Sequence, residues 1–150
     1  MNGRFLFHVV RVFAAAGLVA AIIPGQGCKS RMPYEEVLRR NAEAMNRKCP
    51  IVVQDGVRLD STSAGPGKRF TYYYTLIGQS RDSVDARSME NRLRPILTEN
   101  LRTSRSLEVL RKNRPDVDYR FLDRKGRLVL SIVVRPEEYA GRIPPSRSST

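Results

Sequence analysis

The stretch RFTYYYTL, residues 69–76, decides the fold of this chain. It consists almost entirely of aromatic and β-branched residues, which favour strands, and successive side chains of a strand point to opposite faces. One face would hold Phe70, Tyr72, Tyr74 and Leu76, and the other Thr71, Tyr73 and Thr75. The stretch therefore predicts a strand with one face in a core and Tyr73 on the side that meets water.

A second strand is predicted just before this one, so that the two form a hairpin. Val57 and Leu59 alternate with Arg58 and Asp60, and the turn AGPGK (64–68) follows. The GPGK segment resembles a phosphate-binding loop, but it lacks the long glycine loop, the Ser or Thr after the lysine, and a following helix. We therefore interpret it as a hairpin turn. Upstream, residues 51–54 read as strand, and Asp55-Gly56 marks a bend or bulge.

Two helical patterns and a second hairpin complete the domain. Residues 34–49 carry an apolar stripe at helical spacing, and so do residues 89–101, where Pro95 predicts a kink or two abutting helices. Residues 117–134 alternate around a turn at 123–126. The order helix, hairpin, helix, hairpin predicts an α+β domain over residues 34–139. Its sheet should be four-stranded and antiparallel with the helices packed on one face. Residues 140–150, rich in Pro and Ser, predict a disordered tail.

Residues 1–27 have the pattern of a signal peptide. A head with Arg4 and Arg11 precedes an apolar core over residues 12–23, and Pro24-Gly25 ends it. The small residue Gly27 before Cys28 favours a lipoprotein signal that is cut before Cys28, which would then be acylated and followed by a tether over residues 28–33. Ordinary secretion with an unmodified Cys28, or an uncleaved anchor, remain alternatives.

Charge and the scarcity of Cys and His limit the possible functions. The 27 basic residues exceed the 15 acidic ones, and the chain after residue 28 still has a net charge of +10. This charge favours anionic partners. Because His8 in the leader is the only histidine, histidine triads and zinc sites are excluded, and we predict no metal and no cofactor. Cys49 is interpreted as a small buried residue, or as a disulfide partner if Cys28 is not acylated.

Few residues of the predicted domain are candidates for a functional site. Tyr73 could contact a partner from the water-exposed face, where Arg58 and Asp60 should form an ion pair. The carboxylates Asp55, Asp60, Asp116 and Asp118 could act as an acid/base pair, but nothing in the sequence places two of them together. We therefore predict a contact surface at Tyr73, Arg58 and Asp60 and no catalytic residues.

Two segments together resemble a family of small, largely uncharacterised bacterial envelope proteins. They are NRKCPIVVQDGVRLDSTSAGPGKRFTYYYTL (46–76) and DRKGRLVLSIVV (123–134). The shared features are a leader, a helix ending near Cys-Pro, and an Arg-Leu-Asp…Gly-Pro-Gly…Tyr-x-Tyr-Thr-Leu pattern. The resemblance covers about residues 34–135 and implies export and an α+β fold, but no activity.

The sequence thus predicts an exported, lipid-anchored envelope protein, not an enzyme, that binds an anionic or protein partner. The partner would be an envelope protein or an anionic polymer, and nucleic acid is not expected. The domain would lie in the periplasm, and Lys29 after the cysteine favours the outer membrane. A soluble periplasmic or secreted protein is the alternative localisation. A carboxylate hydrolase of cell-wall sugars and an exported inhibitor or immunity-type protein are the alternative functions.

Overall fold

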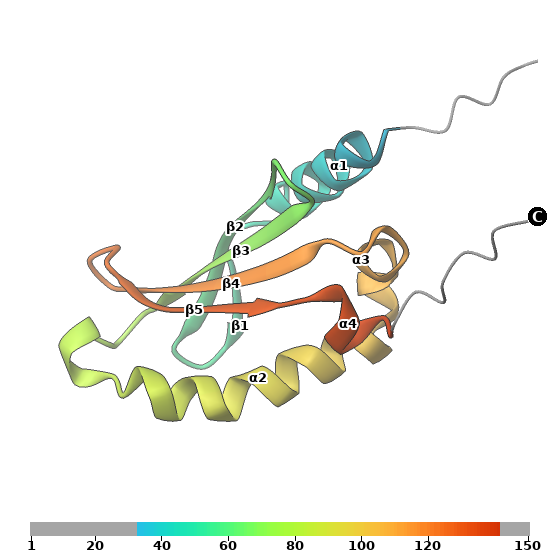
Figure 1. Cartoon of the computed structure of the whole chain (residues 1–150). Coiled ribbons are helices and arrows are strands. Elements are labelled where there is room, and N and C mark those ends of the chain that lie inside the picture. Colours follow the sequence, from blue (N-terminus) through green and yellow to red (C-terminus); the bar gives the residue numbers. More distant parts are fainter. Residues whose placement is uncertain (1–32, 142–150) are drawn as a thin grey trace, which may run out of the picture. The chain divides into compact units, whose positions relative to one another are not determined.

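The computed structural model describes residues 33–141, which form an α+β domain (Figure 1). Its elements, in chain order, are α1 (Tyr34–Asn46), β1 (Ile51–Gln54), β2 (Val57–Gly65), β3 (Arg69–Leu76), η1 (Arg81–Ser83), α2 (Ala86–Thr103), η2 (Arg105–Leu107), α3 (Glu108–Asn113), β4 (Asp116–Asp123), β5 (Leu128–Val134) and α4 (Pro136–Tyr139). The predicted signal peptide, Cys28 and most of the predicted tail lie outside the described residues. None of the described helices is long and apolar enough to cross a membrane.

The five strands form one mixed sheet in the order β1-β2-β3-β4-β5. All neighbours are antiparallel except β3 and β4, which are parallel. The two predicted hairpins, β2–β3 and β4–β5, are confirmed, and so is the α+β class. The prediction of four antiparallel strands was wrong in two respects.

First, Ile51–Gln54 forms a strand of its own. Of the predicted bend or bulge at Asp55-Gly56, the bend is confirmed: the two residues make a tight turn between β1 and β2, and Gly56 adopts a φ of 76° that favours glycine. Second, α2 and α3 return the chain to the end of the sheet where β3 begins. Strand β4 therefore starts beside Arg69 and runs parallel to β3, as a long helical crossover permits.

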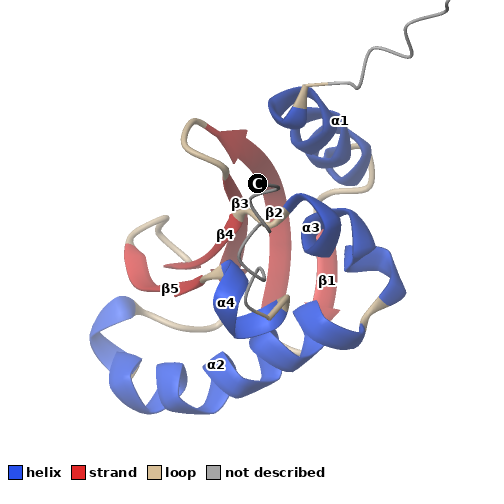
Figure 2. Cartoon of the chain, turned by 45° about the vertical axis from the view of Figure 1, so that its right-hand side comes forward, coloured by secondary structure: helices blue, strands red, loops and turns tan. Residues whose placement is uncertain are grey.

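The core lies between one face of the sheet and the helices (Figure 2). The central strands direct large apolar side chains to this face, among them Phe70 and Tyr72 of β3 and Val117 and Tyr119 of β4, all of which are buried. The helices cover this face with one or two fully buried apolar residues each: Leu38 and Ala42 of α1, Leu101 of α2 and Leu110 of α3. The prediction that Tyr72 packs in the core is confirmed.

Helix α2 is continuous through Pro95, where the sequence predicted a kink or two abutting helices. Asp85 caps its start by accepting a hydrogen bond from the Ser88 backbone N–H at 3.1 Å. The helix instead ends at Thr103, and η2 and α3 follow after Ser104.

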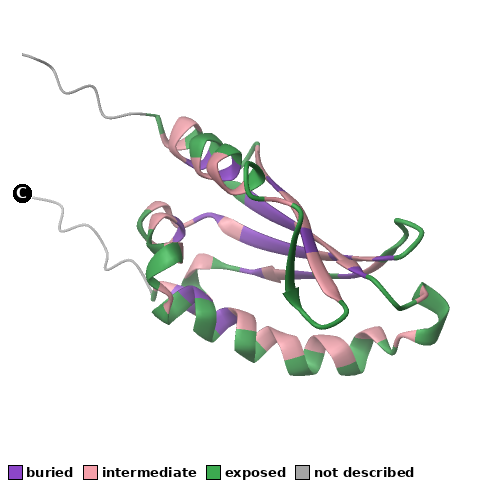
Figure 3. Cartoon of the chain, turned by 180° about the vertical axis from the view of Figure 1, so that it is seen from behind, coloured by how far each residue is buried: buried purple, intermediate pink, exposed green. Residues whose placement is uncertain are grey.

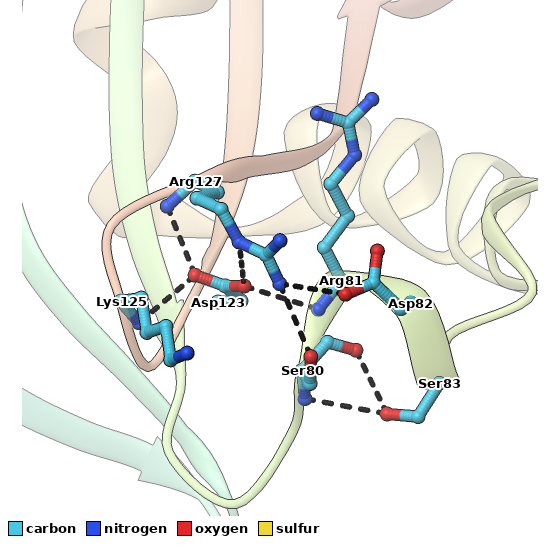
Figure 4. A network of polar contacts seen from close by, with 7 residues as sticks. All are labelled: Ser80, Arg81, Asp82, Ser83, Asp123, Lys125 and Arg127. Carbon is cyan, nitrogen blue, oxygen red and sulfur yellow. Dashed lines mark hydrogen bonds and ion pairs between the residues drawn. The ribbon is translucent and has the colours of Figure 1, made fainter.

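The buried carboxylate of Asp123, at the end of β4, makes hydrogen bonds that fix the start of the β3–β4 crossover against the sheet (Figure 4). Asp123 accepts hydrogen bonds from the backbone N–H groups of Lys125, Arg127 and Arg81, at 2.9–3.1 Å. It also accepts a hydrogen bond from Arg127 Nε at 2.8 Å, and Arg127 Nη2 donates to Asp82 at 3.1 Å. The β4–β5 turn is thereby joined to the segment that leads into α2.

Candidate binding face of the sheet

The strand residues that alternate with the core form a second face, which carries polar side chains. We call it the polar face, and its members are Arg58, Asp60, Ser63, Tyr73, Thr75, Asp118, Arg120 and Ser131. These residues come from four neighbouring strands. Side-chain hydrogen bonds link those of β2 and β3 and those of β4 and β5, and Arg120 contacts the Tyr73 ring between the two groups. All three residues predicted as a contact surface lie on this face.

Arg58 and Asp60 form the predicted ion pair at one side of the polar face. Arg58 Nε donates to Asp60 Oδ1 at 2.5 Å, and Thr75 of β3 donates to Asp60 Oδ2 at 2.5 Å. Asp60 lies at an irregularity in the pairing of β2 with β3, between Leu59 and Ser61. Both carboxylate oxygens are thus occupied, and the carboxylate orients the arginine.

A second pair of the same kind lies on β4. Arg120 Nε donates to Asp118 Oδ2 at 3.0 Å, and Ser131 of β5 donates to Asp118 Oδ1 at 2.6 Å. Asp118 is buried, with 1% of its surface exposed, whereas the Arg120 side chain is 41% exposed. A buried carboxylate therefore anchors an exposed guanidinium.

Tyr73 lies next to this second pair. It is the register neighbour of Arg120 across the parallel β3–β4 boundary, and the Arg120 guanidinium lies 6.0 Å from the centre of its ring. Its hydroxyl is 3.4 Å from Ser63 Oγ on β2. The ring is half-buried, so the side chain is held by neighbours while part of it meets solvent.

The two arginines can bind carboxylates. Each uses its Nε for its own aspartate, and the terminal amino groups of Arg58 and Arg120 have no hydrogen-bond partner within residues 33–141. A guanidinium held in this way keeps two parallel donors for an incoming carboxylate, and its anchor reduces the entropy lost on binding. The face is locally balanced in charge, so it would select by directional hydrogen bonds more than by net attraction.

Sequence reasoning found Tyr73, Arg58 and Asp60 but missed Arg120 and Ser131 as members of the surface. A signal was present, because Asp118 and Arg120 have the same two-residue spacing of acid and arginine as Arg58 and Asp60. The sequence gives no signal for the pairing of β3 with β4, and only this pairing brings Arg120 beside Tyr73.

The carboxylates considered for acid/base chemistry are dispersed. Asp55 lies in the β1–β2 turn and Asp116 at the start of β4, while Asp60 and Asp118 are each bound to their own arginine and hydroxyl. Strand β3 separates the last two. No group of three or more potential metal ligands occurs among residues 33–141.

Cys49 packs against the core, half-buried, at the end of the α1 segment. Burial, and to a lesser degree the nearby Asp60 charge, raises the pKa of its thiol. A raised pKa disfavours the thiolate and hence a nucleophilic role. Its predicted partner in a disulfide, Cys28, lies outside the described residues.

Residues 32–131 match a protein family described as a domain of unknown function, DUF8479. The chain belongs to this family. No curated protein is similar enough in sequence to count as a match.

Three solved structures share the fold of this member of the family. A candidate secreted protein from Pseudomonas aeruginosa is 12% identical with a TM-score of 0.60, and the match covers 70% of this chain and 91% of that one. The pilotin EpsS from the Vibrio vulnificus type 2 secretion system is 11% identical with a TM-score of 0.54, covering 74% and 94%. AspS, the type II secretion system pilotin of Vibrio cholerae, is 8% identical with a TM-score of 0.53, covering 70% and 91%. At these identities the likeness shows the fold alone.

Proposed function

We propose that this chain is an exported, lipid-anchored protein of the bacterial cell envelope that binds a partner protein through the polar face of its sheet. The partner presents carboxylates to Arg58 and Arg120 and packs on Tyr73. Acylated Cys28 anchors the chain, residues 29–33 are the tether, and the domain lies in the periplasm, with the outer membrane as the favoured location.

The pair of anchored arginines is the observation that carries the proposal. Each is fixed by an aspartate through Nε, and each has terminal amino groups that no described residue uses. One of these groups lies beside the Tyr73 ring and the other lies opposite Thr75 on the next strand, an arrangement suited to a surface of Asp and Glu side chains. Arginine and tyrosine are also the residue types enriched at the energetic centres of protein interfaces.

Export and anchoring are supported by the leader. A basic head, an apolar core and Gly27-Cys28 have the order of a lipoprotein signal. The net charge of +10 after residue 28 would add attraction to anionic headgroups and to acidic partners. The shared fold includes two pilotins of secretion systems, which makes a protein of such an assembly a reasonable class of partner.

The contact face can be tested by photo-crosslinking in the native host. A photoreactive phenylalanine analogue at position 73 should yield a discrete adduct with one envelope protein. The same analogue at position 92, on the exposed side of α2, should not. Exchanging Arg58→Lys and Arg120→Lys together keeps both charges but removes the planar donors, so the adduct should be lost from an otherwise folded protein. Identical adducts from positions 73 and 92, or an adduct that survives both lysine exchanges, would contradict the proposed face.

The anchor can be tested by the intact mass of the protein from its native host. We expect a chain that begins at Cys28 and carries the mass of acyl groups, and a Cys28→Ser variant that is neither acylated nor retained in membranes. A mature chain without the mass of acyl groups would contradict the lipid anchor and would indicate a soluble exported protein.

A further inference from the structure

We infer that the free edge of β1 is a second docking site, where an extended acidic segment of a partner protein adds to the sheet as a further strand. This goes beyond the proposed function because it uses a different surface and different chemistry.

Strand β1 is the outermost strand of the sheet and is exposed along its whole length (Figure 3). Its apolar side chains are Ile51, Val52 and Val53, which are 38%, 62% and 52% exposed. Among residues 33–141, its hydrogen bonds join it to β2 alone. An uncovered edge of β-branched residues offers unpaired backbone groups that another strand can use.

The other sheet edges of the domain each receive side-chain hydrogen bonds from a neighbouring helix. Helix α2 runs alongside β5, at the opposite edge, and Arg94 Nη1 of this helix donates to the Val133 carbonyl at 3.0 Å (Figure 1). Strand β2 is longer than β1. On the part of its edge that β1 does not reach, the Asn46 side chain makes the hydrogen bonds that a neighbouring strand would make. Its side chain accepts from the Thr62 N–H at 2.6 Å and donates to the Thr62 carbonyl at 2.8 Å. Against this pattern, the apolar edge of β1 stands open.

A groove lies next to Ile51, the first residue of β1. It has a volume of about 540 Å³ and is lined by Asn41, Ala44, Met45, Arg47, Lys48, Ile51, Ser106 and Leu107. We call it the basic groove, because apolar side chains form much of its wall and its two charged residues are both cations. Arg47 and Lys48 form no ion pair within the described part of the chain. Since Ile51 belongs both to β1 and to the groove, a strand added to β1 could place an apolar side chain in it.

The charge of the site selects its occupant. A second copy would bring two Arg47–Lys48 pairs together in chains that each carry a net charge of +10 after residue 28. The chain's own residues 142–150 contain two arginines and no acid, so they do not complement the groove either. A partner segment in which apolar residues alternate with Asp or Glu fits all three features. Its backbone could pair with β1, an apolar side chain could enter the basic groove, and its carboxylates could pair with Arg47 and Lys48.

The test uses the full chain in detergent and a capped peptide in which valine alternates with glutamate. Binding should protect the amides of residues 51–54 from hydrogen exchange. A peptide with lysine in place of glutamate, and one N-methylated at alternate residues to remove its backbone donors, should bind at least about tenfold more weakly. Exchanging Arg47→Glu and Lys48→Glu together should weaken the glutamate peptide by about tenfold or more.

A matched control changes the net charge equally at a distance from β1. Arg87→Glu with Arg92→Glu, on exposed positions of α2, should alter affinity by no more than about twofold. No binding at about 1 mM peptide, binding without protection of β1, or equal losses in the two double variants would overturn the inference. Protection of β1 that rises with protein concentration and needs no peptide would assign the edge to a second copy instead. Because Arg58 and Arg120 take no part, their lysine variants should bind the peptide normally, which separates this test from that of the polar face.

Discussion

Truncating Asn46 to alanine should destabilise the domain far more than its place on an exposed helix end suggests. The Asn46 amide occupies the edge of β2 and satisfies both backbone groups of Thr62, at 2.6 Å and 2.8 Å. It also lies 3.1 Å from the Thr62 hydroxyl. Alanine would leave all of these groups without this partner while Thr62 itself is only 3% exposed.

The expected loss follows from the two backbone groups. A buried donor or acceptor left unpaired costs about 1–3 kcal/mol. Because Asn46 is exposed, water can partly replace its amide, so we take the lower half of that range for each group and expect about 2–4 kcal/mol in total. A domain of this size has about 5–15 kcal/mol of stability, so the loss would be a substantial fraction. The midpoint of thermal unfolding should fall by about 10–20 °C.

Chemical denaturation followed by circular dichroism measures this change. Asn41→Ala is the matched control, since Asn41 is on the same helix and its side chain makes no hydrogen bond within residues 33–141. It should change the free energy of unfolding by less than about 0.5 kcal/mol. Asn46→Asp keeps an acceptor for the Thr62 N–H but loses the donor, so its stability should lie between those of Asn46→Ala and the unchanged protein. Equal stabilities for Asn46→Ala and Asn41→Ala would refute the idea that a side chain closes this edge.

Three other substitutions should change the stability of the domain in a direction that the structure specifies. Burial alone would raise the pKa of Asp123, but backbone N–H groups and the Arg127 guanidinium outweigh it and hold this pKa well below its ordinary value. The resulting stability is present above the unfolded pKa of about 4 and is lost as pH falls below it, so acid titration of unfolding should be flatter for Asp123→Asn. Tyr72→Phe removes a buried hydroxyl that has no partner among the described residues and should stabilise by up to about 1 kcal/mol. Tyr139→Phe removes a hydroxyl that donates to the Pro115 carbonyl at 2.6 Å and should destabilise by about 1 kcal/mol; urea unfolding of both variants tests the opposite signs.

Much of the local structure could be predicted from the sequence, because local periodicity determines which side chains share a face. Residues 69–76 alternate with a period of two, so Tyr72 had to lie on the core side if Tyr73 met water. Both hairpin turns were predicted from their glycines, and Gly67 and Gly126 adopt the positive φ that glycine accommodates. The contact residues Arg58 and Asp60 could be paired because they lie two positions apart on one strand.

The relations between distant segments were decided only by the tertiary structure. Whether β4 runs parallel or antiparallel to β3 depends on where the helical crossover returns the chain, and no local pattern in either strand records that direction. The same is true of the candidate surfaces. Arg120 lies beside Tyr73 only through the β3–β4 pairing, and β1 is an open edge because no other segment of residues 33–141 pairs with it on that side. Alternation along a strand specifies its faces, whereas its neighbours are set by the packing of the whole domain, to which residues far apart in sequence contribute.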